Sequence, residues 1–426
     1  MDLSIKFCGV KFENPFLLSS SPVSNTGEMV ARSFDAGWGG VVFKTLHADQ
    51  VPIIHPSPRM NTYNYGSKKN IGLQNVEMIS DRNLKDNLLD FLYLKKNYPN
   101  KVLISSIMGF SNDEWAYLAK ASEDNGADML ELNFSCPHMS VEGTGHHVGK
   151  AFDLIEKFTA TVKKTVSIPV IAKMTPNVTE MIEPALCAKQ GGADAISAIN
   201  TVSGISEIGI NDFVPKPNIS GLSSVSGMSG SIVKPIGLRF ISEMGQCKEL
   251  SLPLSGIGGI ETWVDALEFI LVGASTIQVT TSIINYGYGI IQDIIEGLQD
   301  FMALKNINKI QDLVGKALPN IKSTDNFDFK HQGNTNYDLK KCVGCGQCYV
   351  VCHDAAGQAI SWDKEKRRPI LDKDKCLSCM ICSFICPVED LITYNKMPLT
   401  WNRKQAPVMG KIFAKDLKYK PFCNQT

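Results

Sequence analysis

The sequence lacks the features of an exported or membrane-embedded protein. No apolar run approaches the roughly 18 to 20 residues that a membrane-spanning helix needs. The N-terminal stretch holds Asp2 and Lys6, and it lacks the basic start, apolar core and small-residue cleavage site of a signal peptide. We therefore expect a cytoplasmic protein with no membrane partner.

The sequence also lacks an excess of charge of either sign. Lys and Arg together number 43, as do Asp and Glu, so the formal net charge is zero, and like charges form no long block. Such a chain lacks the basic stretches that bind nucleic acid. The charge balance is more compatible with a small neutral or polarised substrate than with nucleic acid.

No G-x-G-x-x-G turn follows a predicted strand, which disfavours a doubly wound dinucleotide-binding sheet. Instead, short apolar runs alternate with helix-period segments from Asn14 to about Leu304, as in repeated βα units. Eight strands are predicted, at Pro15–Ser19, Gly40–Lys44, Val102–Ile107, Asp128–Asn133, Pro169–Met174, Ala195–Asn200, Pro253–Gly256 and Thr276–Val279. Because eight strands close a barrel, we predict an α/β fold of the (β/α)8 TIM-barrel type. Two long insertions, residues 46–98 and 202–231, are expected to be lids or binding loops.

Cysteine is plentiful, and its spacing is specific. Eight of the thirteen cysteines form two runs of the pattern C-x2-C-x2-C-x3-C, namely Cys342, Cys345, Cys348 and Cys352, then Cys376, Cys379, Cys382 and Cys386. This is the spacing of bacterial two-cluster ferredoxins, in which the fourth cysteine of each run ligates the other 4Fe-4S cluster. One cluster is therefore expected on Cys342, Cys345, Cys348 and Cys386, and the other on Cys376, Cys379, Cys382 and Cys352. A pair of structural zinc sites is the alternative.

These patterns predict four regions. The barrel is expected over residues 1–304, a polar linker over 305–334, a bacterial-type two-cluster ferredoxin domain over 335–394 and a C-terminal arm over 395–426.

Polar residues and glycines end the predicted strands or directly follow them, at the end of a barrel where active sites gather. They are Lys44-Thr45, the segment from Asn133 to His138, the segment from Lys173 to Asn177, Asn200-Thr201, the glycine-rich segment 256–259 and Thr280-Thr281. The last two match the usual phosphate site of the fold, after strands seven and eight.

In this order, the segments resemble the class 1 dihydroorotate dehydrogenases, and more closely the dihydropyrimidine dehydrogenases, in particular the catalytic subunits of the bacterial NAD-dependent enzymes. The resemblance covers nearly the whole chain, from Asn14-Pro15-Phe16 through both cysteine runs. It implies an FMN in the barrel, two 4Fe-4S clusters, and the reversible reduction of uracil or thymine to the 5,6-dihydro form.

The resemblance also implies residue roles. Contacts to FMN are expected from Ser20, Lys44, Thr45, Lys173, Gly230, Ile257, Gly258, Gly259, Thr280 and Thr281. Contacts to the pyrimidine are expected from Asn75, Asn133, Ser135, Asn200 and Thr201, and Cys136 matches the acid-base cysteine. The chemistry agrees, because a hydride added to one carbon of a C=C bond leaves its neighbour in need of a proton from a positioned group such as a thiol. Lys173 is the candidate to stabilise negative charge on the reduced flavin.

No segment corresponds to the FAD and pyridine-nucleotide domains that the animal form of the enzyme carries on one chain. The resemblance therefore implies a hetero-oligomer with an NADH-oxidising flavoprotein subunit that holds FAD and iron-sulfur clusters. Two alternatives stay open. One is dihydroorotate oxidation, for which the substrate's carboxylate needs an extra cationic or amide contact, and the other is a non-catalytic electron-transfer subunit.

Overall fold

A closed barrel of eight parallel strands forms the larger part of the computed structural model, which describes residues 1–49, 52–66, 68–134, 149, 151–331 and 333–395. The strands follow one another around the barrel in chain order, and the eighth pairs with the first. They are β3 Phe16–Leu18, β4 Gly40–Val42, β7 Val102–Ile107, β8 Met129–Asn133, β9 Val170–Lys173, β10 Ala195–Ala198, β13 Leu254–Ile257 and β14 Ala274–Val279. The predicted barrel is confirmed, and all eight predicted strands are present.

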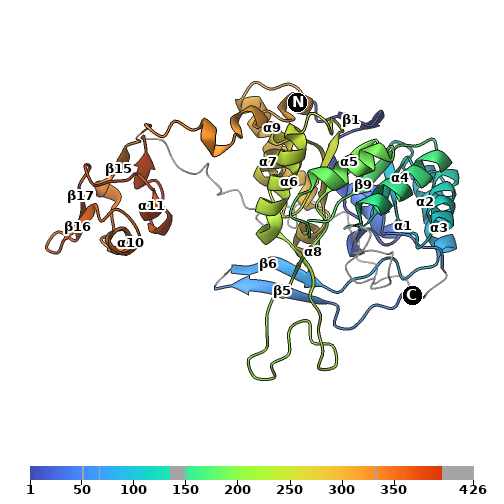
Figure 1. The fold of residues 1–426 in the computed structure, drawn as a ribbon, viewed down its shortest axis with the longest axis horizontal. Coiled ribbons are helices and arrows are strands. Elements are labelled where there is room, and N and C mark those ends of the chain that lie inside the picture. The colour runs from blue at the N-terminus through green and yellow to red at the C-terminus, as the bar shows by residue number, and fades with distance from the viewer. Residues whose placement is uncertain (50–51, 67, 135–148, 150, 332, 396–426) are drawn as a thin grey trace. The chain divides into compact units, whose positions relative to one another are not determined.

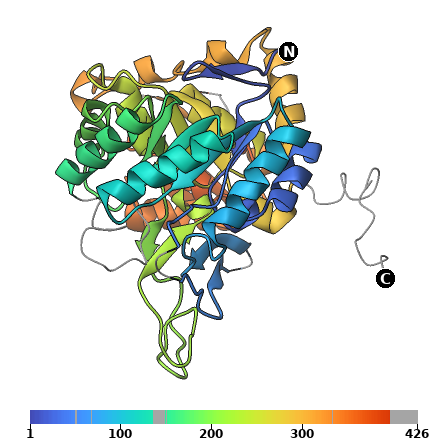
Figure 2. The same cartoon turned by 90° about the vertical axis from the view of Figure 1, so that its right-hand side faces the viewer.

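Helices surround the barrel strands (Figures 1 and 2). They are α1 Gly27–Ala36, α2 Leu84–Asn97, α3 Asn112–Asp124, α4 Phe152–Thr165, α5 Ile182–Gln190, α6 Lys234–Gln246, α7 Trp263–Leu271, α8 Thr281–Tyr286 and α9 Ile290–Leu304. Four of them begin at a residue whose side-chain oxygen accepts a backbone N–H of the first turn, namely Thr26, Asn83, Ser111 and Thr262. Such caps satisfy donors that the helix itself leaves unpaired.

A hairpin closes the N-terminal end of the barrel. Its strands, β1 Ile5–Phe7 and β2 Val10–Phe12, pair antiparallel. Phe7 and Phe12 are fully buried and belong to one apolar cluster with Ile104 of β7. The opposite end, where the strands have their carboxyl ends, is the end at which barrels of this type carry their sites.

The two insertions pair with each other in a four-stranded antiparallel sheet that the sequence did not predict (Figure 1). In sheet order the strands are β11 Val202–Gly204, β12 Ser226–Ser229, β6 Lys68–Asn75 and β5 Met60–Tyr65. The register places Asn75 opposite Gly227. Residues of both segments expected to be lids or binding loops therefore pair in one sheet.

The chain divides into two compact units between Asn320 and Ile321. The barrel domain was predicted to end at residue 304, and beyond that position Ile310 and Leu313 are buried in the same apolar cluster as the barrel residues. Short 3-10 helices lie at η1 Pro22–Ser24, η3 Ser231–Val233, η4 Ile310–Leu313, η5 Leu318–Asn320, η6 Thr324–Asn326 and η7 Leu339–Lys341. Beyond residue 395, the predicted C-terminal arm lies outside the described residues. Within the described ranges, no helix has the length and apolar character to cross a membrane.

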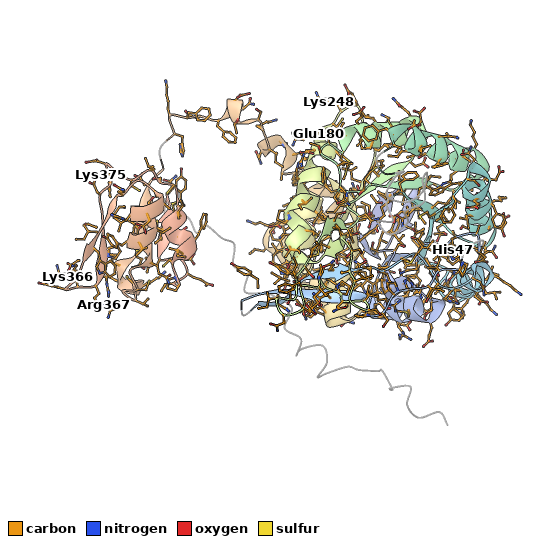
Figure 3. All side chains as sticks on the ribbon, turned by 60° about the horizontal axis from the view of Figure 1, so that its bottom comes forward. His47, Glu180, Lys248, Lys366, Arg367 and Lys375 are labelled. Atoms are coloured by element: carbon orange, nitrogen blue, oxygen red, sulfur yellow. The ribbon has the colours of Figure 1, made fainter. Side chains whose placement is uncertain are left out.

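The second unit is small and is built around its cysteines. Its elements are β15 Thr335–Tyr337, α10 Gln347–Ala355, β16 Ile360–Asp363, β17 Arg368–Leu371, α11 Ile381–Ile385 and β18 Ile392–Tyr394. β15 pairs antiparallel with β18, and β16 with β17. Cysteines of both runs pack in one buried cluster with Ile360 and Ile392, while Lys366, Arg367 and Lys375 lie on the surface of this unit (Figure 3).

Gly297 lies inside α9 at a point where α7 packs closely against it. A Cβ atom at this position would overlap the indole ring of Trp263. Replacing glycine by alanine in a helix normally stabilises by about 1 kcal/mol, but here we expect Gly297→Ala to destabilise by about 1 to 3 kcal/mol because the indole must move. Denaturant unfolding measures this. The exposed Glu296→Ala on the same helix is the control, with a change within about 0.5 kcal/mol, and a stabilised Gly297→Ala would contradict the packing described.

Candidate active site and iron-sulfur centres

A cavity opens at the carboxyl ends of the barrel strands. It encloses about 1100 Å³ of empty space, part of which is open to solvent. Every described residue that was predicted to contact FMN or pyrimidine lines it: Ser20, Lys44, Thr45, Asn75, Asn133, Lys173, Asn200, Thr201, Gly230, Ile257, Gly258, Gly259, Thr280 and Thr281. Ser135 and Cys136 lie outside the described residues. The structure thus brings the strand ends and the insertion sheet together around one space.

Hydrogen bonds between strand ends orient the amides in this cavity. Nδ2 of Asn133 donates to Oγ1 of Thr45 at 3.0 Å, and Nδ2 of Asn200 lies 3.4 Å from Oδ1 of Asn133. The Thr45 hydroxyl also lies 3.0 Å from Oγ of Ser20 and 2.8 Å from Oγ of Ser106. These bonds join residues that follow β3, β4 and β10 to a residue of β7 and to the last residue of β8. An amide held in this way presents a fixed donor and acceptor to a ligand.

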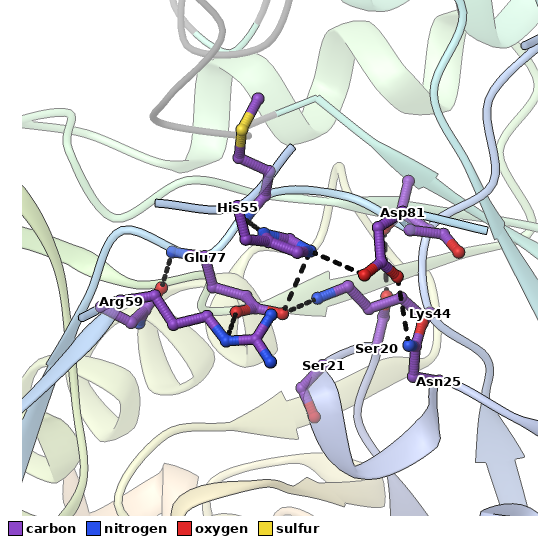
Figure 4. A network of polar contacts seen from close by, with 12 residues as sticks. Ser20, Ser21, Asn25, Lys44, His55, Arg59, Glu77 and Asp81 are labelled. Carbon is purple, nitrogen blue, oxygen red and sulfur yellow. Dashed lines mark hydrogen bonds and ion pairs between the residues drawn. The ribbon is translucent and has the colours of Figure 1, made fainter. Parts of the chain in front are cut away.

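Lys44 is paired with a carboxylate that the sequence analysis missed. Its Nζ lies 2.5 Å from Oε1 of Glu77, and both side chains are buried. Nε of Arg59 lies 3.3 Å from Oε2 of the same carboxylate (Figure 4). Glu77 lines the cavity, two residues after Asn75. In the sequence, only its closeness to the predicted site residue Asn75 pointed to Glu77. The path of the insertion, which brings Glu77 to Lys44, could not be inferred from the local sequence pattern.

His55 lies next to Glu77 (Figure 4). Its Nδ1 accepts the backbone N–H of Met78 at 3.2 Å, and its Nε2 lies 3.7 Å from Oε1 of Glu77 and 4.0 Å from Oδ2 of Asp81. Burial lowers the pKa of His55 below its ordinary value, against the opposing effect of Glu77. Because Nδ1 accepts a backbone N–H, the ring proton lies on Nε2, which faces the two carboxylates.

Lys173, the second lysine of the cavity, also has a buried carboxylate partner. Its Nζ lies 3.1 Å from Oε1 of Glu131 and 3.3 Å from Oγ of Ser19. Oε2 of Glu131 accepts a hydrogen bond from Oγ of Ser197 at 2.8 Å and another from Nε2 of Gln278 at 2.7 Å. Glu131 is fully buried. Both lysines that line the cavity are therefore countered by a carboxylate.

Glycines allow three backbone segments to meet at the wall of the cavity. Gly230, Gly258 and Gly259 have φ angles of 93°, 121° and 72°, a region that favours glycine. A Cβ at position 259 would stand 2.9 Å from the carbonyl oxygen of Gly230, and one at position 230 would stand 3.0 Å from Cα of Gly72. Side chains at these positions would force the segments apart. Backbone this close to a cavity can offer N–H groups to a phosphate.

In the smaller unit, the cysteines of the two runs line two separate cavities of about 330 Å³ each. Cys342, Cys345, Cys348 and Cys386 line one, and Cys352, Cys376, Cys379 and Cys382 line the other. Each cavity combines three cysteines of one run with the fourth of the other. The ligand sets predicted from the spacing have this same grouping.

Two family models match the chain. The dihydroorotate dehydrogenase model matches residues 2–302, and the 4Fe-4S dicluster domain model matches residues 336–394. The chain belongs to the dihydroorotate dehydrogenase family. The second match confirms the predicted two-cluster domain after the barrel, and it favours 4Fe-4S clusters over zinc sites.

Curated relatives bear out the predicted resemblance. The NAD-dependent dihydropyrimidine dehydrogenase subunit PreA of Escherichia coli (strain K12) is 46% identical over 411 residues, which cover 96% of this chain and 98% of the relative. The chloroplastic dihydropyrimidine dehydrogenase (NADP(+)) of Arabidopsis thaliana is 38% identical over 328 residues, 74% of this chain and 77% of the relative. The catalytic subunit of dihydroorotate dehydrogenase B (NAD(+)) of Pyrococcus horikoshii is 35% identical over 316 residues, 74% of this chain and 98% of the relative.

Among solved structures, the fold is similar to that of the dihydroorotate dehydrogenase of Eimeria tenella in complex with ferulenol. The TM-score is 0.61 at 18% sequence identity, and the match covers 74% of this chain and 88% of that one. At this identity the likeness concerns the fold alone.

The family implies FMN in the barrel, and the residues of the cavity fit it. The glycine segments suit a phosphate, and the two lysines suit a ring that gains negative charge on reduction. Gln278 lines the cavity, and its Oε1 atom is buried without a hydrogen-bond partner among the described residues. Since a buried acceptor without a donor is costly, a ligand with N–H or O–H groups suits this atom.

Glu261, which follows the glycine segment and lines the cavity, generates a pH-dependent prediction. Burial, with a smaller effect of Asp265, raises the pKa of Glu261 to about 7, above an unfolded value of about 4.3. Between these values the folded protein binds more protons than the unfolded chain, so this group makes stability fall as pH rises.

We therefore expect Glu261→Gln to be more stable than the wild type by about 2 to 3 kcal/mol at about pH 8, and by less than half of that near pH 5. Unfolding midpoints at the two pH values measure the difference. The exposed Glu249→Gln serves as the control and should give the same small change at both. A gain at Glu261→Gln that did not depend on pH would contradict the assignment.

Proposed function

We propose that this chain is the catalytic subunit of a dihydropyrimidine dehydrogenase, which reversibly reduces uracil or thymine to the 5,6-dihydro form. The proposal is supported by the similarity to the E. coli subunit along nearly the full length of both chains. The structural observation that carries it is a cavity in which three asparagines, Asn75, Asn133 and Asn200, share the wall with the Lys44–Glu77 ion pair.

The chemistry of this wall suits a neutral ring with alternating amide and carbonyl groups. Each asparagine offers a donor and an acceptor, Thr201 adds a hydroxyl, and Glu77 can accept from a ring N–H. Ser135 is proposed as a further contact. Dihydroorotate, the alternative substrate, carries a carboxylate, which Glu77 would repel while holding the nearest lysine. The cavity therefore favours the pyrimidine over dihydroorotate.

FMN is proposed to be held by Ser20, Lys44, Thr45 and Lys173 and by the segments that contain Gly230, Ile257, Gly258, Gly259, Thr280 and Thr281. When bound, it supplies the hydride that reaches C6 of the pyrimidine. Cys136 donates the proton that C5 then needs, so that one hydride and one proton together saturate the C5–C6 bond. Lys173 stabilises the negative charge of the reduced cofactor.

We infer that electrons reach the barrel from NADH through a partner subunit. The partner would be an NADH-oxidising flavoprotein with FAD and iron-sulfur clusters, and the two 4Fe-4S clusters of this chain would pass the electrons on. The word "subunit" in the name of the E. coli relative supports a hetero-oligomer. Eight cysteines that must stay thiolates favour the reducing cytoplasm as the compartment.

The substrate assignment is tested by anaerobic turnover with a reduced viologen dye as electron donor. We expect oxidation of the dye with uracil or thymine, little or none with orotate, and a loss of about 10²- to 10⁴-fold in Cys136→Ala, because the proton donor is gone. Cys187→Ala, at a partly buried cysteine that is not among the proposed site residues, is the control and should keep full activity.

Flavin and iron contents, measured in the same samples, show that each variant retains its cofactors. Faster turnover of orotate than of uracil would support the dihydroorotate alternative. Full activity in Cys136→Ala would support a non-catalytic electron-transfer role.

The partner assignment makes a separate prediction about the physiological donor. The isolated chain should reduce uracil with the dye but not with NADH, because no part of it is assigned to NADH oxidation. Stopped-flow spectra of the oxidised protein mixed with NADH should show no bleaching of flavin or clusters. Robust NADH turnover by the pure chain would refute the need for a partner.

A further inference from the structure

The buried pair of Glu131 and Lys173 has a role beyond holding the barrel together. Lys173 ends β9 and lines the cavity, while Glu131 lies on β8, two residues before the cavity-lining Asn133. Alternate residues of a strand share a face, so Glu131 stands one layer deeper inside the barrel than Asn133. Its carboxylate is fully buried and lies 3.1 Å from the lysine Nζ.

The second oxygen of Glu131 is bound as firmly as the first. Oε2 accepts from Oγ of Ser197 on β10 and from Nε2 of Gln278 on β14. Nε2 of Gln278 also lies 3.2 Å from Oγ of Ser255 on β13. Donors from several strands thus offset the cost of burying a carboxylate. The network fixes a negative charge directly behind the ammonium group that the cavity presents.

We propose that Glu131 is a positioning residue that sets the electrostatic field at the flavin. It holds the ammonium group of Lys173 at the cavity wall and offsets part of its positive charge. This inference rests on the proposed function, because it takes Lys173 as the lysine that meets the flavin. An ammonium group without this partner would favour the reduced, negatively charged flavin more strongly. Glu131 therefore keeps the reduction potential of the flavin lower and its electrons more reducing.

The test compares the flavin of the full-length holoprotein with that of Glu131→Gln, a variant of nearly equal shape. Sulfite is a suitable probe, because it adds to N5 of oxidised flavins, places negative charge on the ring and bleaches the flavin without bleaching the clusters. We expect the sulfite dissociation constant to fall on the order of tenfold in Glu131→Gln. The reduction potential, measured against a reference dye, should rise.

Ser197→Ala is the matched control, since it removes a hydrogen bond to Oε2 but leaves the charge in place. Its sulfite affinity and potential should stay close to those of the wild type. If Glu131→Gln changes neither quantity, or moves both in the opposite direction, the inference is overturned. A merely structural role for Glu131 would alter stability in both variants and leave the flavin unaffected.

A second pair of variants tests the same charge if Glu131→Gln does not fold. Lys173→Met should weaken sulfite binding, and adding Glu131→Gln in that background should restore part of it, because the buried negative charge is removed together with the positive one. No recovery in the double variant would overturn the inference.

Wild-type flavin content and uracil turnover separate this result from the proposed function. A wild type that holds flavin but does not reduce uracil would overturn only the proposed function. A wild type without flavin would overturn both.

Discussion

The backbone pairing of β14 with β3 closes the barrel, and the cavity depends on that closure. The N–H of Ile277 donates to the carbonyl of Pro15 at 2.8 Å, and the N–H of Ser19 donates to the carbonyl of Val279 at 3.0 Å. Residues that follow the first strand and residues that follow the last thereby line one cavity, although they lie far apart in the sequence. Apolar side chains of the hairpin pack against the N-terminal end of the barrel. The cavity therefore lies at the opposite end, where the strands have their carboxyl ends.

Each lysine that lines this cavity forms an ion pair with a glutamate. Lys44 is bound to Glu77 and Lys173 to Glu131, and all four side chains are buried. A buried ion pair is weak evidence for stability, because desolvation offsets much of the attraction. The pairs are better explained by what they present to a ligand, which is strong hydrogen-bonding groups with little net charge. Such a wall suits an uncharged heterocycle more than an anion.

Much of the fold and of the cavity wall could be predicted because both depend on local pattern. Strand ends such as Asn133 and Asn200 follow recognisable apolar runs, and strand ends of a parallel barrel meet at one face. Glu77 and Glu131 could not be assigned in this way. The position of Glu77 depends on the pairing of β6 with β12, which joins two insertions far apart in the sequence. Glu131 lies within a strand, where a charge gives no local hint of its partner on the next strand.

The unit that holds the two cysteine runs and the barrel differ in what stabilises their folds. Each of their cavities needs three cysteines from one run and one from the other, so neither is complete until α10 and α11 have come together. A unit this small buries few apolar residues, and in such units metal binding commonly supplies much of the folding free energy. The barrel has a large apolar core of its own. Loss of one cysteine should therefore disturb both clusters together, while the cavity at the carboxyl ends of the barrel strands keeps its shape.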